Sequence, residues 1–109
     1  FEEAIKMAKS NLLVEGAGHS AALHSDNDQN IQMAGLELPI SRLVVNQPSS
    51  TTAGGSLTNG FAPTTTLGCG SWGGNSISEN LDYKHLMNVS RIGKIIPDKK
   101  VPTDEEIWS

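Results

Sequence analysis

Residues 62–80 have the sequence APTTTLGCGSWGGNSISEN, and the interpretation of the whole chain depends on them. Four of the seven positions from 68 to 74 are glycine, and the same segment holds Trp72 and the single cysteine, Cys69. Because glycine loses more backbone entropy on folding than other residues, such a cluster indicates positive φ angles or close backbone approach. Flexible linkers are also rich in glycine and serine, but they rarely contain tryptophan. We therefore predict an ordered loop that lines a site.

Strand and helix patterns alternate over residues 20–46. Ser20–His24 is short with an apolar centre, and Ser41–Asn46 contains three contiguous apolar residues, as in a strand buried on both faces. Between them, apolar residues at helical spacing occupy Ile31, Ala34 and Leu38. Strand, helix and strand with short joins are typical of a βαβ unit in a parallel sheet, so we predict an α/β fold.

Start and stop signals place the ends of the expected helices. Asp26, with Gln29 three residues later, has the spacing of a capping box, and Gly35 or Pro39 would end the helix that follows. The chain also opens with a helical pattern, whose apolar stripe is Phe1, Ile5, Ala8 and Leu12. No capping residue precedes that helix, and the first residue is not methionine, so we expect a piece of a longer polypeptide.

The second half of the chain is less regular. Residues 47–63 are rich in Pro, Ser, Thr and Gly and predict a loop. Ser76 with Glu79 predicts a helical turn near Ile77, and Leu86–Ile96 has the composition of a strand. Thr103 with Glu106 predicts a last helical turn that buries two apolar side chains, Ile107 and Trp108.

Composition and charge exclude several classes of partner. The net charge is −4 with no basic patch, so we expect no nucleic-acid partner. No apolar run approaches the roughly 18 residues of a membrane span, so we expect no membrane partner. One cysteine permits no internal disulfide and fits a reducing compartment, so we expect a cytoplasmic protein, with a bacterial microcompartment as the alternative location.

The motifs contain no complete catalytic set. Gly68–Gly73 matches G-x-G-x-x-G, but threonines precede it where a dinucleotide-binding loop has a hydrophobic strand, so a pocket wall is the better interpretation. Cys69 between two glycines fits a small packed residue, and a thiol catalyst formed with His85 is the weaker alternative. The three histidines lack metal-ligand spacing, so we expect no metal site.

Three segments resemble a known family: GHSAALHSDND (18–28), SRLVVNQPSS (41–50) and APTTTLGCGSWGGNSISENLDYKHLMN (62–88). They look like the C-terminal part of CoA-acylating aldehyde dehydrogenases, including the aldehyde dehydrogenase half of bifunctional aldehyde-alcohol dehydrogenases. The resemblance implies the C-terminal part of a catalytic domain over residues 1–84, an oligomerisation strand over 85–97 and a tail over 98–109.

The family's chemistry follows as an expectation. An upstream cysteine forms a thioester from the aldehyde, NAD or NADP takes the hydride, and coenzyme A releases acyl-CoA. Cys69 matches a different family cysteine, so this chain alone is expected to be inactive and to bind no cofactor. The expected partners are an aldehyde, the rest of the parent polypeptide and further copies in a homo-oligomer. The alternative is a stand-alone, non-catalytic binding or oligomerisation module.

The resemblance also implies site residues. His19 matches a family histidine and would be an accessory to catalysis. The substrate or cofactor pocket would be formed by Pro48, Ser49, Gly70, Ser71, Trp72 and Gly73, with Trp72 either as a wall of the acyl pocket or as core filler. If the chain is detached from a larger domain, the apolar side chains Ile31, Val44 and Ile92 should be poorly covered.

Overall fold

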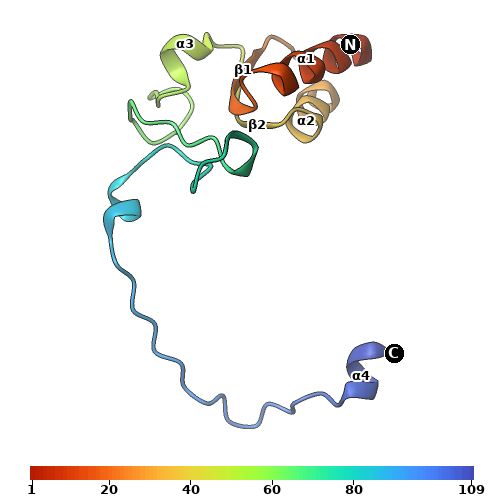
Figure 1. Ribbon diagram of the computed structural model, residues 1–109, viewed down its shortest axis with the longest axis vertical. Coiled ribbons are helices and arrows are strands. Elements are labelled where there is room, and N and C mark those ends of the chain that lie inside the picture. Colours follow the sequence, from red (N-terminus) through yellow and green to blue (C-terminus); the bar gives the residue numbers. More distant parts are fainter.

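The computed structural model describes residues 1–109, and its regular elements all precede residue 87 except one short terminal helix (Figure 1). In chain order they are α1 (Glu2–Val14), β1 (Gly18–Leu23), α2 (Asp28–Glu37), β2 (Ile40–Val45), α3 (Ser49–Thr52), the 3₁₀ turns η1 (Ser71–Gly73) and η2 (Tyr83–Leu86), and α4 (Asp104–Trp108). No helix is long and apolar enough to cross a membrane.

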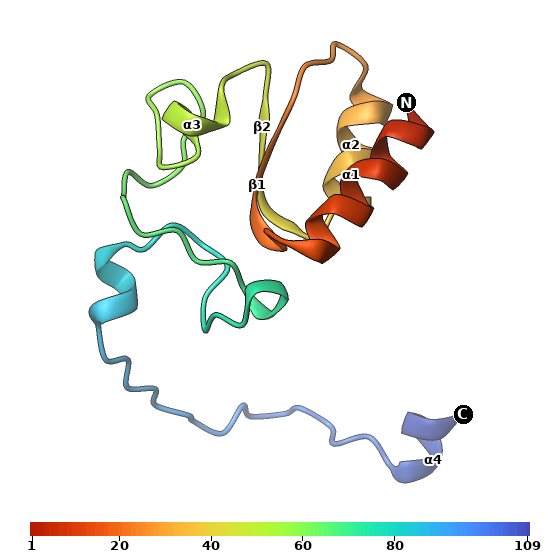
Figure 2. The same ribbon diagram turned by 45° about the horizontal axis from the view of Figure 1, so that its top comes forward.

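The predicted βαβ unit is confirmed. Strands β1 and β2 pair in parallel, in a register that runs from Gly18 opposite Ile40 to Leu23 opposite Val45. Figure 2 shows α1 and α2 together on one side of this two-stranded sheet, and α3 with the later loops on the other side. The core between the helices and the sheet is formed by Ile5, Ala34, Leu38 and Ile40.

The buried interior is small for a chain of this length. Only 11 of the 109 residues are buried. The radius of gyration is 19.2 Å, whereas a compact domain of 100 residues has about 13 Å. The exposure expected of Ile92 is confirmed, and Ile31 is half-buried. The exposure expected of Val44 is wrong, because residues 47–82 fold back over the face of β2 that carries Val44 and Arg42.

Helix α2 begins one residue later than the capping pattern predicted. Its N-cap is Asn27, whose Oδ1 accepts hydrogen bonds from the backbone N–H groups of Gln29 and Asn30 at 2.9 and 3.2 Å. The prediction of Asp26 as the cap was therefore wrong. The cap is nevertheless an Asp/Asn-type residue whose side-chain oxygen accepts hydrogen bonds from the first turn, as predicted. At the other end, Pro39 follows the last turn and Gly35 lies inside the helix.

The structure corrects two predictions in the loops. A short helix, α3, forms within the predicted loop of residues 47–63. No helical turn forms at Ser76, because residues 67–80 instead make a narrow antiparallel hairpin with a bridge between Leu67 and Asn80. The next turn is η2, which Asp82 caps by accepting a hydrogen bond from the N–H of Tyr83 at 2.7 Å.

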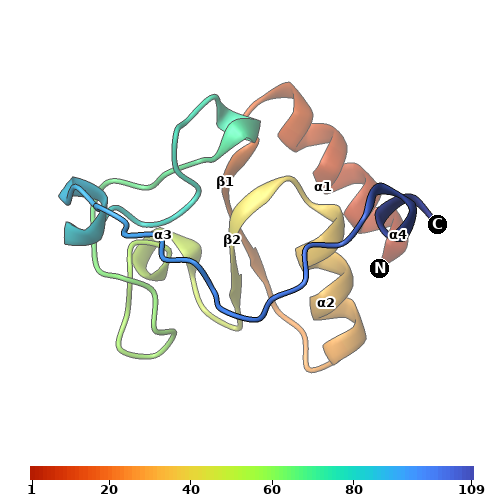
Figure 3. The ribbon, with the colours of Figure 1, turned by 90° about the horizontal axis from the view of Figure 1, so that it is seen from below.

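The strand predicted over Leu86–Ile96 does not form. Leu86 ends η2, and residues 87–96 have no strand partner. Figure 1 shows this segment leading away from the body, and Figure 3 shows it from below. A strand forms only when its backbone groups pair with a neighbouring strand, so the composition of residues 86–96 alone was not enough to predict one. The domain boundaries and the oligomerisation role of residues 85–97 stay predictions.

The terminal helix confirms one prediction and corrects another. In α4, Thr103 and Glu106 form the predicted capping box. The expected burial of its apolar residues is wrong, since Ile107 and Trp108 are 52% and 84% exposed. The physical reason is that the extended segment before α4 carries it away from the sheet, where no surface of the chain covers it (Figure 1).

Candidate functional site

The glycine-rich segment is an ordered loop, as the sequence predicted. Gly68 lies so close to the returning chain that a Cβ atom there would be 2.4 Å from the carbonyl oxygen of Ile77. At Gly73, a Cβ atom would be 2.5 Å from that of Cys69 and 3.1 Å from the carbonyl oxygen of Ala17. The glycines therefore allow the loop to close on itself and to approach the residue before β1.

The loop does not have the chemistry of a pyrophosphate-binding loop. The backbone N–H groups of Gly68 and Gly70 donate to the carbonyls of Glu79 and Ile77 at 3.0 and 2.8 Å, and those of residues 73–75 donate within the turn. A phosphate-binding loop instead leaves its N–H groups open to the ligand, at the start of a helix. Here only a three-residue 3₁₀ turn follows. The loop fits a wall and does not fit a dinucleotide.

A hollow of about 530 Å³ lies between β1, α3 and the start of the glycine-rich segment. It brings together two predicted site residues, His19 from β1 and Ser49 from α3. The other lining residues are mostly hydroxyl-bearing or small: Ser20, Ser50, Ala53, Gly54, Thr64, Thr65 and Leu67. Sequence reasoning missed these hydroxyls, and the density of Ser and Thr at 49–52 and 64–66 was the signal that pointed to them.

The remaining predicted pocket residues lie outside this hollow. Pro48 is the N-cap residue of α3 and precedes Ser49. Gly70 precedes η1, which consists of Ser71, Trp72 and Gly73 and does not line the hollow. Trp72 is 55% exposed, so it does not fill the core of this segment. Its role as a wall of the acyl pocket stays a prediction.

The histidines are placed differently from one another. His19 is exposed, and its Nδ1 lies 2.7 Å from Oγ of Ser20. His85 Nδ1 accepts a hydrogen bond from the N–H of Asp82 at 2.8 Å. The Sγ of Cys69 lies 3.9 Å from the carbonyl oxygen of Leu67, and no contact joins it to His85. The structure therefore offers no support for a Cys69–His85 catalyst, and no cluster of side chains has the composition of a metal site.

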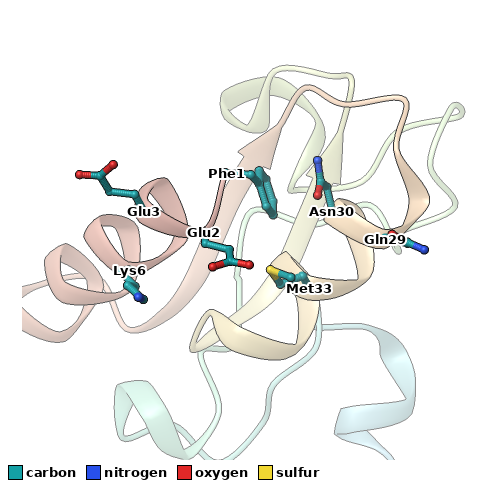
Figure 4. A pocket seen from close by; sticks show the side chains of 7 residues that line it. All are labelled: Phe1, Glu2, Glu3, Lys6, Gln29, Asn30 and Met33. Carbon is teal, nitrogen blue, oxygen red and sulfur yellow. The ribbon is translucent and has the colours of Figure 1, made fainter.

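The largest hollow, about 780 Å³, is separate from these residues. It is an open groove between the first turns of α1 and α2. Figure 4 shows Phe1, Glu2 and Met33 gathered between the two helices, with Glu3 and Gln29 directed outward. None of the predicted site residues lines it, so its size alone does not make it the functional site.

A buried polar pair anchors the wall to the sheet. Arg42 on β2 is 3% exposed and donates to Oδ1 of Asn80 at 3.4 Å and to the carbonyl of His19 at 3.2 Å. The Nδ2 of Asn80 donates to the carbonyls of Ala53 and Ala62 at 3.0 and 2.9 Å. These bonds fix the glycine-rich loop, the end of α3 and β1 relative to one another. Sequence reasoning did not identify this pair.

A surface ion pair lies beside the end of the loop. Lys84 donates a hydrogen bond to Glu79, which holds the pKa of the Glu79 carboxyl below its ordinary value and raises the pKa of Lys84. His85 Nε2 lies 3.7 Å from the same carboxylate. Both partners of the Glu79–Lys84 pair are more than half exposed, so the pair contributes little to stability.

No family model matches the chain. It is 69% identical over 108 residues to a succinate-semialdehyde dehydrogenase (acetylating) of Clostridium kluyveri, a match that covers 99% of this chain and 24% of that protein. It is 37% identical over 107 residues to a sulfoacetaldehyde dehydrogenase (acylating) of Cupriavidus necator, covering 98% of this chain and 22% of that protein.

Solved structures similar to this chain are also aldehyde dehydrogenases. A probable aldehyde dehydrogenase from Listeria monocytogenes superposes with a TM-score of 0.80 at 38% identity, over 97% of this chain and 22% of that one. An acetylating aldehyde dehydrogenase from Geobacillus thermoglucosidasius gives a TM-score of 0.78 at 32% identity, over 94% of this chain and 22% of that one. The chain thus spans about a quarter or less of the length of these relatives. These similarities show that the chain is homologous, over nearly its whole length, to one segment of the longer acylating aldehyde dehydrogenases.

Proposed function

We propose that this chain is the C-terminal segment of an oxidoreductase that converts an aldehyde, CoA and NAD(P)⁺ into acyl-CoA. The segment contributes part of the pocket wall and a subunit contact, and the reactive cysteine lies upstream. The observation that carries the proposal is the 69% identity to an acetylating succinate-semialdehyde dehydrogenase over nearly the whole chain.

The hydroxyl-lined hollow is the part of the segment that would face the acyl group. The nicotinamide cofactor accepts hydride and CoA supplies the thiol that takes up the acyl group. Within the segment, the hydrogen bond to Ser20 orients the His19 ring and leaves Nε2 without a partner in the chain. That nitrogen is the accessory group we assign to catalysis. Because the glycine-rich loop uses most of its N–H groups internally and only a 3₁₀ turn follows Gly70, the dinucleotide would be held by residues outside this segment.

Succinate semialdehyde is the first substrate to test, since it is named for the 69% identical relative. The full-length protein is incubated with this aldehyde, CoA and either NAD⁺ or NADP⁺. Reduced nicotinamide is followed by absorbance, and the acyl-CoA product is identified by mass spectrometry. Nicotinamide reduction that requires CoA supports the proposal. A full-length protein that forms no acyl-CoA from succinate semialdehyde, acetaldehyde or sulfoacetaldehyde would reject it.

The tail is the proposed subunit contact. Residues 88–96 have no backbone hydrogen bond within the chain, and the apolar side chains of Val89, Ile92, Ile95 and Ile96 are exposed, as expected of a strand that pairs with a second copy. Deleting residues 86–109 from the full-length protein should lower its oligomeric state in sedimentation velocity. If the truncated protein keeps the oligomeric state of the full-length protein, the subunit contact lies on another surface.

A further inference from the structure

Arg42 is a buried charge for which this chain supplies no acid. Its side chain is 3% exposed, and it takes part in no ion pair. Two long hydrogen bonds, to Asn80 and to the carbonyl of His19, engage its Nη1 and Nη2. Its Nε is enclosed without an acceptor, and so is Oγ of the neighbouring Ser41. A buried guanidinium in this state is uncompensated, because such charges are normally paired and fully hydrogen-bonded.

A hollow of about 350 Å³ lies beside this guanidinium. Besides Ser41 and Arg42, the loop residues Phe61 and Asn80 line it, with Glu79 and Lys84. Glu79 is the one acid among these side chains, and Lys84 already engages it, with His85 also within 3.7 Å of its carboxylate. The charged side chains that line the hollow are therefore Arg42, Lys84 and Glu79, and Glu79 is already paired with Lys84. An additional anion would be favoured beside Arg42.

The hollow borders β2, which is an edge strand of a two-stranded parallel sheet. Parallel strands normally lie in larger sheets with both faces covered, so further protein is expected beside this edge. The hollow shares no lining residue with the hydroxyl-lined hollow assigned to the acyl group. Both observations favour an anion that comes from protein over an anion carried by the substrate.

We propose that the hollow beside Arg42 receives a carboxylate side chain from the part of the parent protein outside this chain, which pairs with the Arg42 guanidinium as a buried ion pair. The proposal rests on the proposed function only in that the chain is a segment of a larger protein. The pair would lock the glycine-rich loop and β2 to the rest of the catalytic domain, because Arg42 also holds Asn80.

The test is thermal unfolding of the full-length protein as wild type, Arg42→Met and Lys84→Met. Lys84→Met is the matched control, because it removes a cation from the exposed rim of the same hollow. With a paired carboxylate, Arg42→Met should lower the Tm by about 5 °C or more at pH 7, whereas Lys84→Met should lower it by about 1 °C or less. If no carboxylate is present, Arg42→Met removes an unpaired buried charge together with its hydrogen bonds to Asn80 and His19. A Tm that is unchanged, raised, or lowered by no more than in Asn80→Ala then overturns the proposal.

The pH dependence gives a second, independent readout. Pairing with Arg42 would hold the pKa of the partner carboxylate below its unfolded value. Its stabilisation is therefore present at neutral pH and is lost as the pH falls through the folded pKa. The Tm difference between wild type and Arg42→Met should shrink as the pH falls from about 5 to about 2. A difference that stays constant over this range would overturn the proposal, since Arg42 itself does not titrate there.

Kinetics and crystallography complete the test. If the anion were the substrate, Arg42→Met would raise KM for succinate semialdehyde, leave KM for neutral butyraldehyde unchanged and leave the Tm unchanged, which overturns the proposal. Should Arg42→Met fail to fold, a crystal structure of the full-length wild type decides. A carboxylate within about 4 Å of the guanidinium supports the ion pair, and its absence overturns it. Acyl-CoA formation by the wild type tests the proposed function separately.

Discussion

Gly18 and Cys69 touch through their backbones, because a Cβ atom on Gly18 would lie 2.0 Å from the carbonyl oxygen of Cys69. This contact joins the first residue of β1 to the middle of the glycine-rich loop, 51 positions later in the chain. Gly18 also has a φ of +84°, where side chains other than glycine are strained. The position of the loop against the sheet therefore depends on a residue that lacks a side chain.

Gly18→Ala should destabilise the full-length protein by about 3 kcal/mol, because the methyl group meets backbone that cannot rotate away. Gly35→Ala is the matched control. Gly35 lies inside helix α2, and a Cβ atom there would make only an ordinary contact, at 4.0 Å, with Leu43 on β2. It should stabilise the protein by about 0.5–1 kcal/mol through helix propensity. Urea unfolding of both variants measures the difference. Equal effects would show that the contact between β1 and the loop is not tight in the full-length protein.

Asn80→Ala should cost about 2–3 kcal/mol of unfolding free energy. The change removes one hydrogen bond from Arg42 and leaves the buried carbonyl of Ala53 and the partly buried carbonyl of Ala62 without their donor. Asn11→Ala on exposed α1 is the control and should be neutral within about 0.5 kcal/mol. Thermal unfolding compares the two. A neutral Asn80→Ala would mean that water or another residue takes over these bonds.

Trp72→Ala should change which aldehyde the full-length enzyme prefers, with little change in Tm. The side chain is more than half exposed in this segment, so its removal leaves no cavity in the segment's own core. If Trp72 forms a wall of the acyl pocket, the ratio of kcat/KM between a four-carbon and a two-carbon aldehyde should shift about tenfold. An unchanged ratio together with a lower Tm would assign Trp72 to packing against the rest of the protein.

Cys69→Ala should retain acyl-CoA formation by the full-length enzyme. The Cys69 thiol lies near only one acceptor, the carbonyl of Leu67, and no histidine contacts it. Alkylation of Cys69 at neutral pH, followed by peptide mass spectrometry, should be no faster than alkylation of free cysteine. Loss of activity in Cys69→Ala with an unchanged Tm would contradict an upstream nucleophile.

Glu79→Gln should lower stability slightly at pH 7 and not at all at low pH. Lys84 depresses the pKa of Glu79 below its ordinary value of 4.5, so the pair's contribution is present above that value and is lost as the pH falls through the depressed pKa. Because both side chains are exposed, about 1 M NaCl should remove most of the effect at pH 7. Thermal unfolding as a function of pH and salt measures it. If the stability difference between wild type and Glu79→Gln grows as the pH falls, the predicted direction of the pKa shift of Glu79 is wrong.

Local signals predicted the first half of the fold well. The stripe through Ile5 and Ala8, the apolar strand before Asn46 and the short joins led to a helix, a βαβ unit and a parallel sheet, all of which the structure contains. The capping box at Thr103 and Glu106 was also found. These features depend on hydrogen bonds and periodicities within a few residues, which a sequence displays directly.

Predictions that required a partner in space were less successful. Leu86–Ile96 has a strand composition but no neighbour to pair with, and Ser76 has a cap spacing that the hairpin between Leu67 and Asn80 overrides. In the candidate site, His19 and Ser49 were predicted and do share a hollow, whereas the glycine-rich turn with Trp72 lies outside it.

By itself, the sequence determined that this chain has an ordered glycine-rich loop and an α/β unit of the acylating aldehyde dehydrogenase type. Periodicity and glycine content report on backbone conformation near each residue, and a long specific segment such as residues 67–80 reports on ancestry. Only the tertiary structure decided that Arg42 and Asn80 meet beneath the loop, and that Arg42 does so without an acid. Contacts between residues 38 positions apart depend on how the chain folds back, and no local pattern encodes that path.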